Sequence, residues 1–202
     1  MSTARSGVGR PASIEAPRET ILANAATLFA ANGLERTSLQ DVARAVGLSK
    51  AAIYHYFPTK TDIYDAIVSD LLDTLYHRVL ARIGEAESPS EQLRLLMLEH
   101  ADYFEEHYSQ FVTLLHGVAG LGRRPGEAEV RVRDRYEALV RQLVEAGQAT
   151  GDFAGRDPVL ATRAILSLLN WLSRWYKPDG PLRARAVAAE YFEIVHLGLC
   201  RR

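Results

Sequence analysis

The sequence has very little cysteine and no long apolar run. Its 202 residues include one cysteine, Cys200, which excludes an internal disulfide and suits a reducing compartment. No apolar segment approaches the roughly 20 residues that a membrane-spanning helix needs, so we expect no membrane partner. The first residues, MSTARSGVGRPAS, contain no hydrophobic core of a secretion signal, and we expect a cytoplasmic protein.

The chain also lacks the spacings that mark metal sites and common catalytic centres. Its six histidines show no zinc-ligand spacing, and no G-x-S-x-G sequence, P-loop or catalytic cysteine–histidine pair is present. The glycines of residues 117–122 have the wrong order for a dinucleotide fingerprint, and with Arg123 and Arg124 they predict a loop. We therefore predict no catalytic residue, no metal and no cofactor, and a protein that is not an enzyme.

Charge is nearly balanced overall but unevenly distributed. The net charge is −1, while 48% hydrophobic and 24% charged residues are typical of a globular protein. Residues 1–60 hold seven Lys or Arg and four Asp or Glu, whereas the remainder holds 17 basic and 21 acidic residues. A basic N-terminal part on an acidic remainder is what a DNA-binding unit with a separate control domain would show.

Residues 37–60, TSLQDVARAVGLSKAAIYHYFPTK, are the most informative stretch. Thr37 and Gln40 have the spacing of a capping box, in which two side chains satisfy free backbone N–H groups at a helix start. Ser38 and Asp41 repeat that spacing one residue later, so two starting points stay open. Apolar residues at helical spacing follow and predict a short helix.

A glycine and a second cap follow this helix. Gly47 lies where a sharp turn needs a positive φ, which glycine adopts at little cost. Ser49 is placed to cap a second helix. That helix would expose small and polar residues suited to phosphates and guanine edges: Ser49, Lys50, Ala51, Tyr54 and His55. The pattern is that of a helix-turn-helix, whose second helix enters the major groove, and two ordinary packed helices are the alternative.

The same residues resemble a known family. The signature T-x-x-x-I/V-A-x-x-x-G-x-S/T-x-x-x-x-Y-x-Y/H-F-x-x-K of the TetR family of bacterial transcriptional regulators is nearly complete. Its matching positions are Thr37, Val42, Ala43, Gly47, Ser49, Tyr54, Tyr56, Phe57 and Lys60. The motif-level resemblance covers about residues 14–82, and it implies a dimeric repressor that binds a palindromic DNA operator.

The resemblance, taken with the exposed face of the second helix, predicts which residues contact DNA. Lys60 lies in the first turn of the next helix, where the helix dipole favours an anion, and a neighbouring DNA phosphate would explain a lysine there. We expect a disordered arm over 1–13, a helix-turn-helix DNA-binding domain over 14–58 and an effector-binding and dimerisation domain over 59–202. The predicted DNA contacts are Thr37, Ser38, Gln40, Ser49, Lys50, Ala51, Tyr54, His55, Tyr56 and Lys60.

Helical periodicity recurs along the whole chain and predicts an all-α fold of about nine helices. A three-helix N-terminal head would be joined by one long helix to a larger helical body. Thr59 is expected to cap that long helix, and Ser90 the one after it. The expected ranges are 14 or 17 to 32, 38–45, 49–55, 59–82, 90–107, 109–118, 126–149, 158–176 and 182–199.

The last two of these helices are apolar on most sides, so one small domain cannot bury all of that surface. A symmetric partner that offers the same pair would complete a four-helix interface. TetR-like proteins dimerise in this way, and a dimer would reach two half-sites about one helical turn, roughly 34–36 Å, apart. The predicted dimer contacts are Leu168, Val187, Tyr191 and Ile194.

Aromatic residues of the body suggest an effector pocket. Trp171, Arg174 and Trp175 share one helix face, where indoles would form an apolar wall and Arg174 would bind a phosphate or carboxylate. Core packing or dimer contact is the plain alternative for each of them. The predicted effector contacts are Tyr103, Tyr108, Phe111, His116, Trp171, Arg174 and Trp175.

Residues 170–181, NWLSRWYKPDGP, resemble a TetR subgroup that represses fatty-acid or steroid catabolism genes and responds to acyl-CoA thioesters. The resemblance implies a small hydrophobic effector, with an acyl-CoA as the candidate, that releases the repressor from DNA. Two alternatives stay open: a TetR-type sensor of drugs or aromatic compounds, and a helical enzyme that acts on an acyl-CoA.

Overall fold

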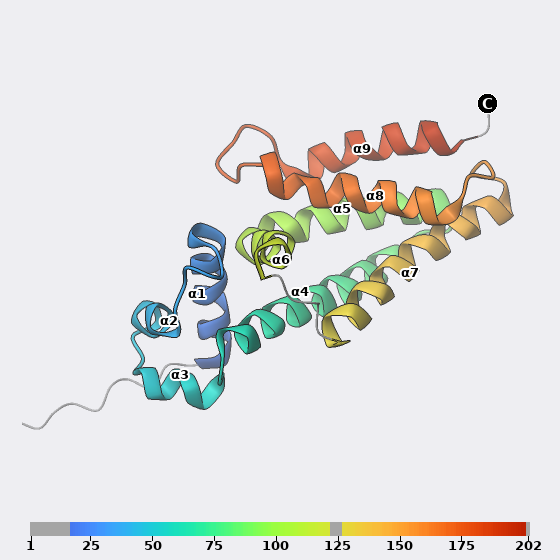
Figure 1. The fold of residues 1–202 in the computed structure, drawn as a ribbon. Helices are drawn as coiled ribbons and strands as arrows, with labels where there is room; N and C mark the ends of the chain where they lie inside the picture. The colour runs from blue at the N-terminus through green and yellow to red at the C-terminus, as the bar shows by residue number, and fades with distance from the viewer. Residues whose placement is uncertain (1–16, 122–126, 201–202) are drawn as a thin grey trace, which may run out of the picture.

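The computed structural model of the chain describes residues 17–121 and 127–200 (Figure 1). All regular secondary structure in these two segments is helical, as the sequence predicts. The nine helices are α1 (Pro17–Asn32), α2 (Leu39–Val46), α3 (Lys50–Tyr56), α4 (Lys60–Ile83), α5 (Pro89–Glu106), α6 (Tyr108–Leu121), α7 (Glu127–Thr150), α8 (Pro158–Trp175) and α9 (Ala184–Leu199). The expected arm over 1–13 and the residues Arg123 and Arg124 lie outside the described segments. None of the described helices is long and apolar enough to cross a membrane.

The start of α2 decides between the two possible capping boxes. Ser38 is the N-cap: its hydroxyl accepts a hydrogen bond from the Asp41 N–H at 3.2 Å, and the Asp41 carboxylate accepts one from the Ser38 N–H at 3.0 Å. Of the two starting points that the spacing leaves open, the structure has the box of Ser38 and Asp41 and not that of Thr37 and Gln40. Two boxes with the same spacing cannot both start one helix, and the acidic partner also lies favourably at the positive end of the helix dipole.

Two further boundaries differ from the sequence-based prediction. Ser88, rather than Ser90, caps α5 and accepts a hydrogen bond from the Glu91 N–H at 3.2 Å, with Pro89 in the first turn, where its missing N–H costs nothing. Helix α6 continues to Leu121, so part of the glycine segment predicted as a loop is helical. A glycine inside a helix costs about 1 kcal/mol, which does not by itself end the helix.

Helices α1–α3 form the head at one end of the molecule, and α4 runs from the head into the body (Figure 1). Helix α5 packs against α4, α7 and α9, while α8 packs against α7 and α9. The head is also attached to the body through α6, which packs along α1. The Thr113 hydroxyl of α6 donates a hydrogen bond to the Ala26 carbonyl of α1 at 3.1 Å, and both side chains are buried.

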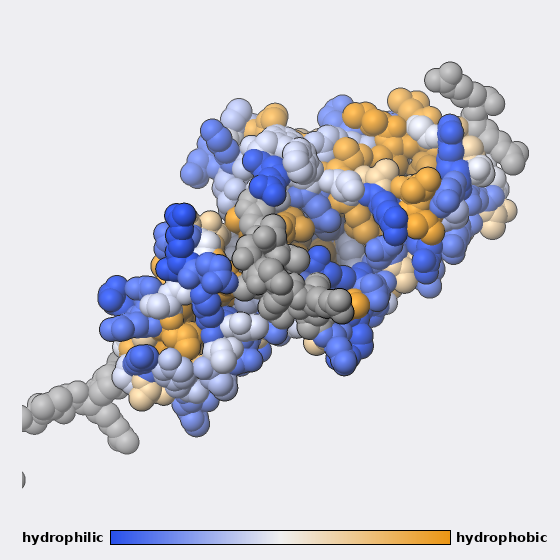
Figure 2. Space-filling model, viewed as in Figure 1, coloured by the Kyte–Doolittle hydropathy of each residue, from blue (hydrophilic) through white to orange (hydrophobic). Residues whose placement is uncertain are grey.

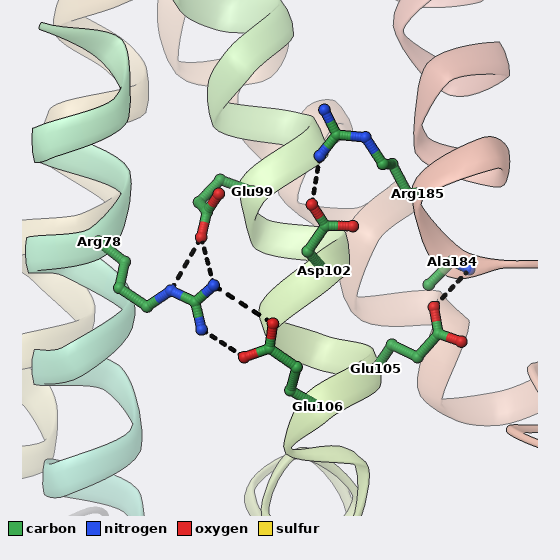
Figure 3. Close-up of polar contacts among 7 residues, drawn as sticks. All are labelled: Arg78, Glu99, Asp102, Glu105, Glu106, Ala184 and Arg185. Atoms are coloured by element: carbon green, nitrogen blue, oxygen red, sulfur yellow. Dashed lines mark hydrogen bonds and ion pairs between the residues drawn. The ribbon is translucent and has the colours of Figure 1, made fainter.

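Charged contacts hold α5 between α4 and α9. Arg78 of α4 pairs with Glu99 at 2.7 Å and with Glu106, both on α5 (Figure 3). Its guanidinium also lies 4.9 Å from the centre of the Tyr103 ring. The hydrogen bond from Arg78 lowers the pKa of Glu106 below its usual value. On the other side, Asp102 pairs with Arg185, and Glu105 accepts a hydrogen bond from the Ala184 N–H at 3.2 Å at the start of α9 (Figure 3).

Candidate functional site

The turn between α2 and α3 has the geometry that the sequence predicts. Gly47 adopts φ 70°, and the Leu48 N–H donates to the Ala43 carbonyl at 3.0 Å. The Ser49 hydroxyl accepts a hydrogen bond from the Ala52 N–H at 3.1 Å, and Ile53, with no exposed surface, anchors α3 to the head. The α2–α3 pair is thus a helix-turn-helix in which α3 is fixed on one side and free on the other.

The free side of α3 carries the residues predicted to contact DNA. Tyr54 is 45% exposed and Tyr56 41%, and the Lys50 ammonium lies 5.6 Å from the centre of the Tyr54 ring. The helix therefore presents a cation, hydroxyl groups and small side chains together, which suits phosphates and base edges. The exposed members of the predicted set are Ser38, Gln40, Ser49, Lys50, Ala51, Tyr54, His55 and Tyr56.

Thr37 does not belong to this surface. It is 2% exposed, and its hydroxyl donates to the Gly33 carbonyl at 2.9 Å. The assignment of this side chain to DNA is corrected accordingly: the hydroxyl fixes the loop between α1 and α2 rather than projecting from it. Sequence spacing could not show this, because a threonine directly before a helix serves equally well as cap, contact or loop anchor.

Lys60 has partners within the protein. Its ammonium donates to the Leu34 carbonyl at 2.9 Å and to the Glu35 carbonyl at 3.1 Å, and it lies 3.6 Å from the Glu35 carboxylate. The lysine thus joins the start of α4 to the loop that follows α1. These contacts explain why a cation lies in the first turn of α4, even when no DNA is bound. Contact between Lys60 and a DNA phosphate stays a prediction.

A cavity of about 170 Å³ lies in the body. Its inner wall is formed by buried residues, and its outer part, between α7 and α8, is lined by the half-buried Arg133, Glu137 and Asn170. The buried part of the wall is thus mostly apolar, with a few polar groups, and the half-buried part is more polar, the usual distribution in small-molecule sites. The lining residues are Leu72, Leu75, His100, Phe111, Leu114, Leu115, Arg133, Tyr136, Glu137, Leu166 and Asn170.

Two polar groups of the inner wall come from different helices. His100 of α5 is 3% exposed and its Nδ1 lies 2.9 Å from the Tyr136 hydroxyl of α7. Burial lowers the pKa of His100 from 6.5 to about 4 and raises the pKa of Tyr136 above its usual value, so both side chains are neutral. No sequence pattern predicts this pair, because its members are 36 residues apart and share no local spacing.

Arg133 is the cation at the mouth. One of its guanidinium nitrogens lies 2.7 Å from the Glu129 carboxylate, and Glu129 is 2% exposed. The Arg133 side chain is 37% exposed although its Nε and Nη2 atoms are buried, so it reaches from a buried partner to the solvent at the entrance. Two neighbouring arginines of α7 do not line the cavity: Arg131 pairs with Glu127 on the surface, and Arg135 pairs with Asp73.

Most of the predicted effector residues lie outside the cavity. Trp171 is 61% exposed and Trp175 39%, and Arg174 lies exposed with its guanidinium 5.9 Å from the centre of the Trp171 ring. None of these three side chains lines the cavity, and their assignment to an effector site stays a prediction. Residues that recur every three to four positions form one face of α8. Their sequence pattern is the same whether that face contacts a ligand or a partner subunit.

The predicted aromatic wall is present, but only part of it reaches the cavity. Phe111 lines the cavity, while Tyr103 and Tyr108 pack behind it, the Tyr108 ring 5.6 Å from that of Phe104. The side chain of His116 lies outside the described residues. Among the described residues, no group of three or more His, Cys, Asp or Glu could hold a metal.

Apolar residues of α8 and α9 that are exposed or half-buried form two adjoining stripes. On α8 they are Leu160, Ala164, Leu168, Trp171 and Trp175, and on α9 they are Val187, Tyr191, Ile194 and Gly198. Ile194 is 63% exposed and Leu160 likewise 63%. Figure 2 shows hydrophobic surface gathered over the end of the α8–α9 pair nearest the C-terminus. The two stripes include all four residues predicted to form the dimer.

A helix-turn-helix head with a basic, tyrosine-bearing second helix, attached to a helical body with a cavity, defines a DNA-binding regulator. Two family models match the chain: "Bacterial regulatory proteins, tetR family" over residues 21–67, and "Tetracyclin repressor-like, C-terminal domain" over residues 86–199. The chain belongs to the TetR family. This membership confirms the prediction of a regulatory protein rather than an enzyme.

Several relatives are similar over nearly the whole chain. The HTH-type transcriptional repressor KstR2 of Mycolicibacterium smegmatis is 30% identical over 184 residues, 90% of each chain. The crystal structure of the TetR family regulator PfmR from Thermus thermophilus has 41% identity and a TM-score of 0.82, over 94% of this chain and 100% of that one. A structure of AibR in complex with isovaleryl coenzyme A and operator DNA has 26% identity and a TM-score of 0.77, over 88% of this chain and 96% of that one.

The exposed cation of α3 leads to a prediction for DNA binding. Replacing Lys50 by Ala should weaken binding and lower the slope of log K against log salt concentration by about 1, because one phosphate contact is lost. Fluorescence anisotropy with the protein's own upstream intergenic DNA, at several salt concentrations, measures both quantities. Lys177→Ala, in the exposed loop after α8, is the control and should change neither. An unchanged slope in Lys50→Ala would remove Lys50 from the interface.

The buried His100 predicts a pH dependence of stability. Because its pKa is lowered in the folded protein, the unfolded chain takes up a proton that the folded chain excludes between pH 6.5 and about 4. The stability is complete above pH 6.5 and falls as the pH drops through this window, by roughly 2 kcal/mol between pH 7.5 and 5 for this group.

Urea unfolding at pH 7.5 and pH 5 tests this dependence. His100→Leu should lose less stability on acidification than the natural protein, by that difference. The exposed His77→Gln serves as the control and should behave like the natural protein. If His100→Leu loses as much stability as the natural protein does, the histidine is not the group that titrates.

Proposed function

We propose that the protein is a dimeric repressor whose DNA binding is released by a small hydrophobic effector, with a short-chain acyl-CoA thioester as the candidate. The cavity carries the proposal. Its apolar interior suits an acyl group, and the Arg133 cation at the mouth suits a phosphate or carboxylate that stays in solvent. The relatives support the repressor function and this class of ligand.

Helix α6 connects the cavity with the head. Phe111, Leu114 and Leu115 line the cavity on one face of α6, and Thr113 on another face is bonded to α1. The Leu114 carbonyl also accepts a hydrogen bond from the Tyr64 hydroxyl of α4 at 3.4 Å. A ligand that displaces α6 therefore acts on both helices that orient the head, and it weakens DNA binding because it prefers the displaced state.

The dimer in this proposal forms through the α8 and α9 stripes, paired about a twofold axis as a four-helix interface. An exposed Trp171 and Ile194 on one continuous face are unusual for a monomer and suit an interface core. Two heads then bind the two halves of a palindromic operator.

The interface predicts the effect of a single charge. Ile194→Glu should convert the dimer to a monomer and abolish operator binding, because a carboxylate would be buried without a partner. Analytical ultracentrifugation and a gel shift give the two readouts. Leu182→Glu is the matched control: Leu182 is 53% exposed but precedes α9 and lies outside both stripes. A dimeric Ile194→Glu that still binds the operator would refute this interface.

The effector is tested by release of DNA. Isovaleryl-CoA, benzoyl-CoA and palmitoyl-CoA, the corresponding free acids and free CoA are added to the complex with the upstream intergenic DNA in a gel shift. We expect release by a short acyl-CoA and at least tenfold weaker release by its free acid. Equal release by acid and thioester, or no release by any thioester, would overturn the acyl-CoA assignment and favour a sensor of aromatic compounds.

A cavity-filling variant assigns the effect to this site. Leu166→Trp at the half-buried mouth should leave DNA binding intact and reduce release by at least tenfold. Leu80→Trp, on an exposed part of α4 away from the cavity, is the control and should respond like the natural protein. Release that survives Leu166→Trp unchanged would place the effector elsewhere.

A further inference from the structure

The inner wall of the cavity contains an unmet polar atom. His100 Nε2 is buried and has no hydrogen-bond partner among the described residues, whereas Nδ1 is bonded to Tyr136. A buried N–H or ring nitrogen without a partner is costly, and native structures rarely retain one without a reason. The ring lines the cavity, so the cavity is the place from which a partner can reach it.

The Tyr136 hydroxyl indicates which kind of partner is missing. Neutral imidazole carries one N–H and one acceptor nitrogen, and a tyrosine hydroxyl has one proton to donate. If Tyr136 donates to Nδ1, both of these groups are satisfied and the proton of His100 is on Nε2. If Nδ1 donated instead, the tyrosine proton would also lack an acceptor among the described residues. The first arrangement leaves one unmet group and the second leaves two, so Nε2 is the donor.

The size of the cavity limits what can meet this donor. An engineered cavity of about 150 Å³ with apolar walls binds benzene. The cavity here measures about 170 Å³, so its interior takes roughly one six-membered ring or a short branched chain. Leu75 and Phe111 provide apolar contacts for such a group beside the histidine.

We propose that His100 is a specificity-determining residue, which donates its Nε2–H to an acceptor oxygen, such as a carbonyl, on the buried end of a ring-sized effector. Tyr136 is the positioning residue that holds the proton on Nε2. The inference rests on the proposed function, since it assumes that this cavity is the effector site. A ligand of the same shape without the oxygen would leave the N–H unmet, which should cost about tenfold in affinity.

The tautomer is measured first, on the ligand-free protein. Two-dimensional ¹H–¹⁵N NMR of histidine-labelled protein at pH 7.5 should show the His100 proton on Nε2. In Tyr136→Phe, which loses only the hydroxyl, the population of this tautomer should fall. A proton on Nδ1 in the natural protein would overturn the inference, because Nε2 would then be an acceptor.

The ligand preference is measured with two small probes of equal shape. Acetophenone carries a carbonyl oxygen where α-methylstyrene carries a methylene group, and the second compound is the more hydrophobic. Titrations followed by NMR should show acetophenone binding at least as tightly as α-methylstyrene, with a change at the His100 Nε2–H on adding acetophenone alone.

Two substitutions separate the donor from the shape of the pocket. The amide nitrogen of Gln reaches the position of His Nε2, whereas that of Asn reaches the position of Nδ1. His100→Gln should therefore keep the ratio of the two affinities, and His100→Asn should shift that ratio by about tenfold toward α-methylstyrene. Chemical unfolding confirms that both variants are folded, and each should still bind operator DNA.

The results separate this inference from the proposed function. An equal preference in the natural protein and His100→Asn, or no binding of either probe, overturns the role of His100. Release of DNA by acyl-CoA thioesters would leave the proposed function standing in that case. Conversely, a preference that depends on His100 supports the donor role even when no thioester releases DNA.

Discussion

The position of α5 is the constraint on which the other helices of the body depend. Its acidic residues meet arginines on two sides, so that α4 and α9 are held at fixed distances from it (Figure 3). An exposed ion pair contributes at most about 1 kcal/mol, but here several charges act together and the Glu99 side chain is only 14% exposed. Beneath them the apolar side of α5 is buried, with Leu96, Met97 and Phe104 fully covered. The ion pairs thus set the orientation of α5, while the burial of its apolar side chains supplies most of the stabilisation.

This arrangement divides the cavity walls into fixed and movable ones. His100 belongs to α5 and inherits its rigidity, so a polar group is held in place against which a ligand can be aligned. Helix α6 is attached differently: Thr113 and the Leu114 carbonyl link it to α1 and α4 by single hydrogen bonds. Each such bond contributes about 1 kcal/mol, which is within what differential binding of a small ligand can supply. His100 therefore lies opposite a helix that contacts both the cavity and the head, which is well placed to convert ligand binding into movement of the head.

Sequence patterns predicted the helix-turn-helix of the head but not the residues that line the cavity, and the difference has a physical reason. The turn at Gly47 and the cap at Ser49 are local, so a short stretch of chain determines them. Even there, Thr37 was misleading, since its hydrogen-bond partner in the loop after α1 depends on how that loop folds back. The pair of His100 and Tyr136 joins two helices far apart in the chain. Trp171 shows the same limit of local patterns. Its helical periodicity predicts an apolar face on α8, but it does not predict which molecule or subunit covers that face.

The contact between Thr113 and Ala26 affects whether the DNA-binding head of one such regulator can be joined to the body of another. A head cut at residue 58 would take α1 away from the buried hydroxyl of α6 that is bonded to it. Such a head, joined to another body, meets a different α6, and its angle to the body is then set by chance contacts. Recombining operator specificity with ligand specificity in this family thus requires transplanting the outer face of α6 together with the head, as a single discontinuous unit of residues that are 87 positions apart.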